Sequence, residues 1–71
     1  MGVVIDVEIR EDMIRLGQFL KLANALDSGG EIKTAIMDGE VEVNGEVDTR
    51  RGRQLFRGDV VTFDGEQWRV A

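Results

Sequence analysis

Residues 40–47 have the sequence EVEVNGEV, and this stretch decides the fold because it predicts a β-hairpin. Val41, Val43 and Val47 alternate with glutamates, a pattern typical of strands with one apolar and one solvated face. Asn44-Gly45, between the two halves, is a preferred dipeptide for a two-residue hairpin turn, in which both central residues adopt positive φ. The stretch therefore predicts two antiparallel strands.

The chain that follows predicts a second hairpin. Residues 60–63 (VVTF) and 68–70 (WRV) are strand-like and are separated by Asp64-Gly65, another turn dipeptide. Trp68 and Phe63 could stack on bases, but in so small a core a structural role is favoured. Residues 50–57 (RRGRQLFR) are predicted to form a connection between the two hairpins.

The residues before residue 40 predict one strand and two helices. Residues 3–9 alternate, with Val3, Ile5, Val7 and Ile9 on one side, and predict a half-buried strand. From Asp12, the expected N-cap, the spacing changes to three- and four-residue steps and predicts an amphipathic helix. Its apolar positions are Met13, Leu16, Phe19, Leu20, Ala23 and Leu26.

A second helix is predicted from residue 28 to about residue 39. Ser28 and Glu31 have the spacing of a capping box, and Gly39 is a natural helix terminator. The glycines after Ser28 could admit a phosphate to the helix N-terminus, but Glu31 would repel an anion there, so an ordinary turn is favoured. The elements together predict an α+β fold in which two helices pack on a small, mainly antiparallel sheet, as one domain over residues 1–71.

The composition excludes several classes of function. Because the 71 residues include no cysteine, histidine or proline, there is no disulfide, thiolate nucleophile, histidine base or Cys/His zinc site. Glu40, Glu42 and Glu46 have strand spacing and predict the solvated face of a sheet rather than paired catalytic carboxylates. No apolar stretch is long enough to span a membrane. We expect a cytoplasmic, non-enzymatic protein without metal or organic cofactor.

Charge is distributed unevenly along the chain. The net charge is −5, but residues 50–57 contain four arginines and no acid. Guanidinium groups bind phosphate oxygens in pairs of hydrogen bonds, so a run of arginines on a loop suits a nucleic-acid backbone. The alternative is a solvated loop that offsets neighbouring acids through weak surface ion pairs.

Taken in chain order, these segments resemble the S4-type RNA-binding domain, and especially its small stand-alone bacterial members of the YbcJ and YaaA type. The segments that carry the resemblance are 14–21 (IRLGQFLK), 28–33 (SGGEIK), 40–46 (EVEVNGE), 50–55 (RRGRQL) and 58–61 (GDVV). The resemblance implies an S4-like fold with an αL-type motif. General members of the family usually carry an acidic residue where Gly17 stands and more basic residues where Gly29-Gly30 stand.

The resemblance also implies that the protein binds structured RNA, ribosomal or tRNA-like, through one face built from the two helices and the arginine loop. Carried over by position, the RNA-binding residues are Arg15, Lys21, Lys33, Arg50, Arg51 and Arg53. An alternative from another class is a protein-interaction module, ribosome-associated, whose arginine loop docks an acidic partner.

Overall fold

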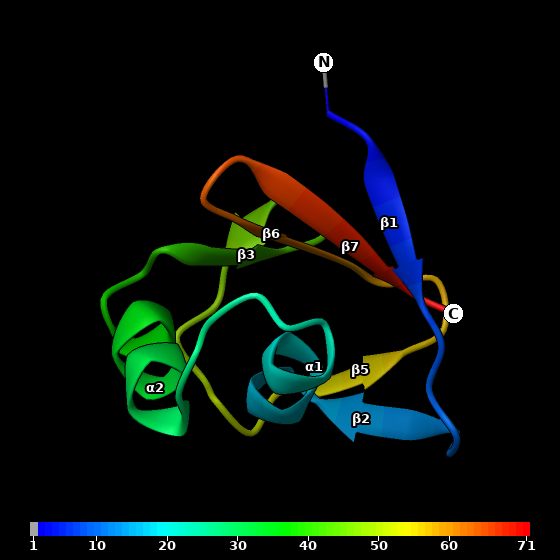
Figure 1. Ribbon diagram of the computed structural model, residues 1–71, viewed down its shortest axis with the longest axis horizontal. Helices are drawn as coiled ribbons and strands as arrows, with labels where there is room; N and C mark the ends of the chain where they lie inside the picture. Colours follow the sequence, from blue (N-terminus) through cyan, green and yellow to red (C-terminus); the bar gives the residue numbers. More distant parts are fainter. Residues whose placement is uncertain (1) are drawn as a thin grey trace.

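The computed structural model describes residues 2–71. In chain order the elements are β1 (Val4–Val7), β2 (Met13–Arg15), α1 (Leu16–Leu22), α2 (Gly29–Met37), β3 (Val41–Val43), β4 (Glu46–Val47), β5 (Gln54–Phe56), β6 (Val60–Phe63) and β7 (Glu66–Val70). Five strands form one sheet in the order β1-β7-β6-β3-β4, and β2 pairs with β5 in a separate antiparallel ribbon. Figure 1 shows both helices on one side of the five-stranded sheet, with the β2–β5 ribbon next to α1. The predicted fold class, two helices on a mainly antiparallel sheet, is confirmed.

Both predicted hairpins are present, because their turn residues adopt the required backbone conformation. Asn44 and Gly45 have φ of 53° and 86°, and Asp64 and Gly65 have φ of 52° and 79°. β3, β6 and β7 are antiparallel neighbours, and Val43, Val61 and Trp68 align across them and are buried. Trp68 is only 4% exposed, so it belongs to the core and offers no stacking surface.

The first hairpin buries fewer valines than the alternation suggested. Val47 pairs across from Glu42 and is 58% exposed, whereas Val41 and Val43 are buried. A two-residue turn places Val43 opposite Glu46, so Val47 falls on the outer face of the sheet.

The second helix begins and ends where the sequence predicts. The Ser28 hydroxyl oxygen accepts a hydrogen bond from the backbone N–H of Glu31 at 3.2 Å, so Ser28 is the N-cap. α2 ends at Met37, and Gly39 follows it with φ of 79°. Ile32, Ala35 and Ile36 form its buried face.

The prediction for the first helix was wrong at both ends. Met13–Arg15 form a strand that pairs with Gln54–Phe56, so Asp12 is not an N-cap and the helix begins only at Leu16. The helix ends at Leu22, and Asn24 has φ of 58°, a conformation that no helix continues through. Pairing between segments about forty residues apart overrode the local helical periodicity. Such a long-range pairing cannot be read from the local spacing of apolar residues.

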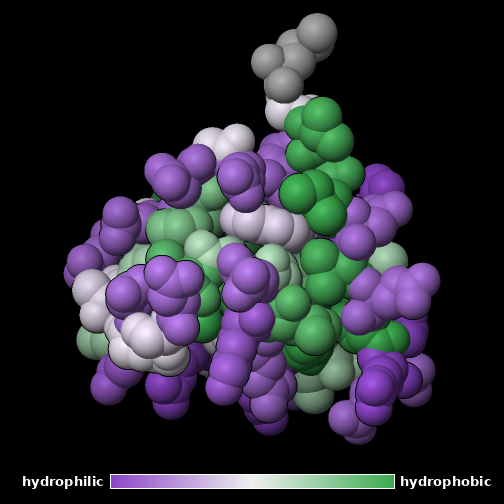
Figure 2. Space-filling view, viewed as in Figure 1, coloured by the Kyte–Doolittle hydropathy of each residue, from purple (hydrophilic) through white to green (hydrophobic). Residues whose placement is uncertain are grey.

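The strand at the N-terminus is shorter and less buried than predicted. β1 lies at an edge of the sheet and pairs with β7 in parallel, which makes the sheet mixed. Val3 is 79% exposed and Ile5 is 48% exposed, so of the predicted apolar side only Val7 and Ile9 reach the core. Figure 2 shows the resulting hydrophobic surface over β1.

Leu55 joins the β2–β5 ribbon to the core. Its side chain is fully buried in one cluster with the helices and the five-stranded sheet, whereas the neighbouring Phe56 is 51% exposed. We expect Leu55→Ala to lower the free energy of unfolding by about 2–5 kcal/mol, because it leaves a cavity in the core. Phe56→Ala is expected to cost less than about 1 kcal/mol.

Urea denaturation of both variants measures this difference. Equal losses of stability would show that the ribbon does not depend on Leu55 for its attachment.

Candidate nucleic-acid interface

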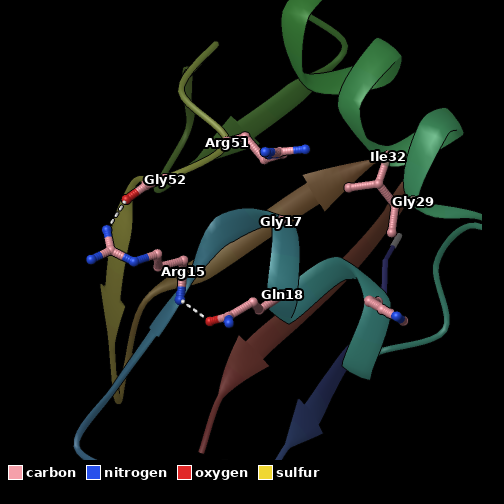
Figure 3. Close-up of a pocket in the computed structure, with 8 residues that line it drawn as sticks. Arg15, Gly17, Gln18, Gly29, Ile32, Arg51 and Gly52 are labelled. Atoms are coloured by element: carbon pink, nitrogen blue, oxygen red, sulfur yellow. Dashed lines mark hydrogen bonds between the residues drawn. The ribbon is translucent and has the colours of Figure 1, made fainter.

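The structure brings three of the six predicted basic residues to one shallow cavity. The cavity lies between α1, the start of α2 and the loop after β4, with a volume of about 390 Å³. It is lined by Arg15, Gly17, Gln18, Lys21, Gly29, Ile32, Arg51 and Gly52. In Figure 3 the Arg51 side chain points from the loop toward Ile32, while the Arg15 side chain turns toward Gly52.

The other three predicted residues lie outside this cavity. Arg50 and Arg53 line an adjoining concavity of about 520 Å³, which Arg15 shares. Lys33 is exposed on α2 and lines neither. The arginine run is also not one continuous loop, because β5 separates Arg53 from Arg57. Arg57 donates a hydrogen bond to the carbonyl of Ile9 at 3.0 Å and so supports the connection after β1.

Backbone hydrogen bonds hold the arginine loop against α1. The N–H groups of Leu16 and Gly17 donate to the carbonyls of Arg53 and Arg51 at 2.8 and 3.0 Å. The first amides of a helix have no partner within the helix, so the loop satisfies donors that α1 leaves free. The Arg15 guanidinium adds a hydrogen bond to the carbonyl of Gly52 at 2.9 Å.

Gly17 allows Arg51 to lie close to α1. A Cβ atom at this position would stand 2.6 Å from Cγ of Arg51, closer than such atoms approach in proteins. A side chain at residue 17 would therefore require Arg51 to shift from the position it takes beside α1.

Asp48 lies beneath the loop and binds two of its arginines. The side chain is 7% exposed, and it is the only buried charged residue among residues 2–71. Nε and Nη2 of Arg50 donate to its two oxygens at 3.1 and 2.8 Å, and Nη1 of Arg53 donates at 2.6 Å. The hydrogen bonds from Arg50 hold the pKa of the Asp48 carboxyl well below its usual range, and the one from Arg53 acts in the same direction against the opposing effect of burial.

The six basic residues therefore differ in their partners. Arg50 and Arg53 share one carboxylate, and Arg15 is bound to the loop backbone. Lys21, Lys33 and Arg51 form no ion pair or side-chain hydrogen bond within the part of the chain that the structure describes. These three cations are free to meet an anionic ligand.

Sequence reasoning missed the contribution of Asp48, since its burial depends on the tertiary fold. The signal available was its position, two residues before the arginine run.

Residues 2–71 contain no cluster of side chains that could hold a metal ion. None of the helices described is long and apolar enough to cross a membrane.

Comparison with known proteins identifies relatives over most of the chain. A model of the S4 domain family matches residues 7–71. A Bacillus subtilis protein named "Probable ribosome maturation protein RlbA" is 52% identical over 59 residues, which are 83% of each chain. An Escherichia coli protein named "Putative RNA-binding protein YbcJ" is 37% identical over 57 residues, 80% of this chain and 81% of that one.

A solved structure shares the fold. The 30S ribosomal protein S4e from Thermoplasma acidophilum superposes with a TM-score of 0.65 at 22% identity. The match covers 84% of this chain and 32% of that protein, so the chain corresponds to about a third of its length.

Asp48 makes Arg53 and Arg51 unequal in their effect on stability. We expect Arg53→Ala to lower the free energy of unfolding by about 1–3 kcal/mol, because a buried carboxylate loses one of its two cationic partners. Arg51→Ala, which breaks no ion pair, is expected to change it by less than about 0.5 kcal/mol. Chemical denaturation of the two variants provides the comparison, and equal values would contradict this account of Asp48.

The stability of the protein is also expected to depend on pH through Asp48. Its pKa in the folded protein lies below the value of about 3.9 in unfolded chains, so its contribution is complete above about pH 5 and is lost as the pH falls through the folded pKa. Asp48→Asn cannot titrate, and its free energy of unfolding should therefore fall less between about pH 5 and pH 2. Urea titrations at several pH values measure both curves; parallel curves would argue against the shift.

Proposed function

The chain belongs to the S4 domain family, and from this premise we propose that it binds structured RNA without catalysing a reaction. The proposed RNA-binding surface consists of Arg15, Lys21, Lys33, Arg50, Arg51 and Arg53. Two relatives support this proposal through their names, one of which refers to RNA binding and the other to ribosome maturation. Ribosomal RNA is the first candidate ligand.

The observation that carries the proposal is the cavity between α1, α2 and the arginine loop. Arg15, Lys21 and Arg51 line it, and neither Lys21 nor Arg51 has a carboxylate partner in residues 2–71. The net charge of −5 does not oppose this role, since charges farther away than about 8 Å are largely screened at physiological salt. The cavity is lined by three cations and no acid, which suits phosphate.

The chemistry of the surface favours recognition of a folded RNA through its backbone over recognition of a particular base sequence. A-form helices conceal the base edges of their major groove and expose phosphates and 2′-hydroxyls. Arginine recognises phosphate oxygens through planar pairs of hydrogen bonds. Phe56, the exposed aromatic residue of the adjoining concavity, is a single ring, so the surface has no series of stacking platforms for an unpaired strand.

A binding titration tests the proposal directly. The purified protein is titrated with a structured ribosomal RNA fragment, an unstructured RNA and duplex DNA, each at two salt concentrations. We expect preference for the structured RNA, with a slope of log affinity against log salt of about −3 to −5 from four to six phosphate contacts. No binding at low salt would reject the proposal and favour an acidic protein partner.

Arg51→Ala is the sharpest single variant, because it removes a cation without disturbing Asp48. We expect the affinity for structured RNA to fall roughly tenfold and the salt slope to become shallower by about 1. Arg69→Ala is the matched control: Arg69 pairs with Asp6 on the sheet face away from the helices and should leave affinity unchanged.

Unchanged affinity in Arg51→Ala would remove the cavity from the binding surface. A combined replacement of Arg50, Arg51 and Arg53 is a poorer test, since it also deprives Asp48 of both partners.

A further inference from the structure

Asp48 is an acid at the centre of a surface proposed to bind phosphate. We propose that Asp48 is a positioning residue for RNA binding, which holds the guanidinium groups of Arg50 and Arg53 in the orientation that meets the RNA backbone. The inference rests on the proposed function and adds a residue to it that makes no contact with RNA itself.

The arrangement places the carboxylate inside and the guanidinium groups outside. The Asp48 side chain is 7% exposed, whereas those of Arg50 and Arg53 are 70% and 31% exposed. Arg50 donates hydrogen bonds to Asp48 from Nε and from one Nη2 hydrogen, and Arg53 donates one from Nη1. The remaining guanidinium N–H groups make no hydrogen bond within residues 2–71 and are available to a ligand.

Asp48 also orders the backbone of the loop. Its Oδ1 atom accepts a hydrogen bond from the backbone N–H of Arg50 at 2.9 Å, in addition to the bond from Nε. Oδ2 accepts from both guanidinium groups, so the lone pairs of the carboxylate are occupied. The N–H of Arg53 donates to the carbonyl of Arg50 at 3.1 Å and closes the turn. One buried group thus fixes two side chains and the turn between them.

Fixed arginines bind more tightly than free ones, because a long side chain otherwise loses conformational entropy when it meets its ligand. The charge of Asp48 has the opposite effect on affinity, since a carboxylate near the site repels phosphate. When Asp48 becomes uncharged, loss of positioning therefore predicts weaker RNA binding, whereas loss of repulsion predicts tighter binding. This difference makes the proposal testable by a single substitution.

The experiment compares Asp48→Asn with Glu46→Gln in titrations against the structured ribosomal RNA fragment. Both substitutions remove one negative charge, but Glu46 is exposed on β4 and forms no ion pair within residues 2–71. We expect Asp48→Asn to weaken binding at least about threefold, and Glu46→Gln to leave it unchanged or slightly stronger. Tighter binding by Asp48→Asn, in a protein shown by circular dichroism to be folded, would overturn the proposal.

A second measurement does not depend on the stability of Asp48→Asn. Arg50→Lys and Arg51→Lys both keep the charge, but only Arg50 makes a two-pronged contact with a carboxylate. We expect Arg50→Lys to bind RNA less tightly than Arg51→Lys, and equal affinities would overturn the proposal.

NMR of the Arg50 Nε–H group in the free protein reports the order of the side chain without RNA. We expect a rigid signal in the parent and a mobile one in Asp48→Asn, and a mobile signal in the parent would also overturn the proposal. If the parent binds no RNA while the Arg50 signal is rigid, the proposed function fails and the inference with it. If the parent binds RNA and Asp48→Asn binds as tightly, only the inference fails.

Discussion

The architecture depends on two hydrogen bonds from the first amides of α1 to the loop that follows β4. Leu16 and Gly17 donate to the carbonyls of Arg53 and Arg51, and in doing so they join parts of the chain that lie far apart in sequence. The strand pair β2–β5 continues this connection, because β2 leads directly into α1 and β5 directly follows the loop. The loop acts as the N-terminal cap of a helix whose own N-cap residue, Arg15, has no side-chain oxygen with which to cap it.

The same loop gives a protein of negative net charge a local surface rich in arginine. Most of the acids are exposed and none lines the cavity, while Asp48, which is buried, lies directly beneath the arginines. A buried carboxylate requires cationic partners, and here those partners reach from the surface inward. The arginine run therefore has a structural role, because Arg50 and Arg53 pair with a buried carboxylate rather than through the weak surface ion pairs that the sequence suggested. Its role in binding nucleic acid stays a proposal.

Much of the fold could be predicted from the sequence, because its hairpins and second helix are specified by local chemistry. Asn44-Gly45, Asp64-Gly65 and Ser28 each set a turn or a cap through their own backbone or side chain. β2 and β5 could not be predicted, since three-residue strands carry no periodicity and exist only as partners of one another. The resemblance to the S4 domain is confirmed over most of the chain.

The basic residues of the candidate site could be identified from the sequence, but their arrangement in space could not. Arg15, Lys21 and Arg51 stand out by charge and by family position, and the structure brings them to one cavity. Asp48 and Gly17 matter through contacts with residues of the loop, and those contacts exist only after folding. The assignment of RNA-binding roles to the six basic residues stays a prediction.

The distance in sequence between the two halves of the site has a thermodynamic consequence. Arg15 and Gly52 are 37 residues apart, yet they are in direct contact, so the surface exists only when the whole domain is folded. A ligand that binds this surface has no site on the unfolded chain, and it must therefore raise the melting temperature by mass action. For any ligand that binds there, occupancy and stability are coupled, and the free concentration of that ligand helps to set how much of the chain is folded.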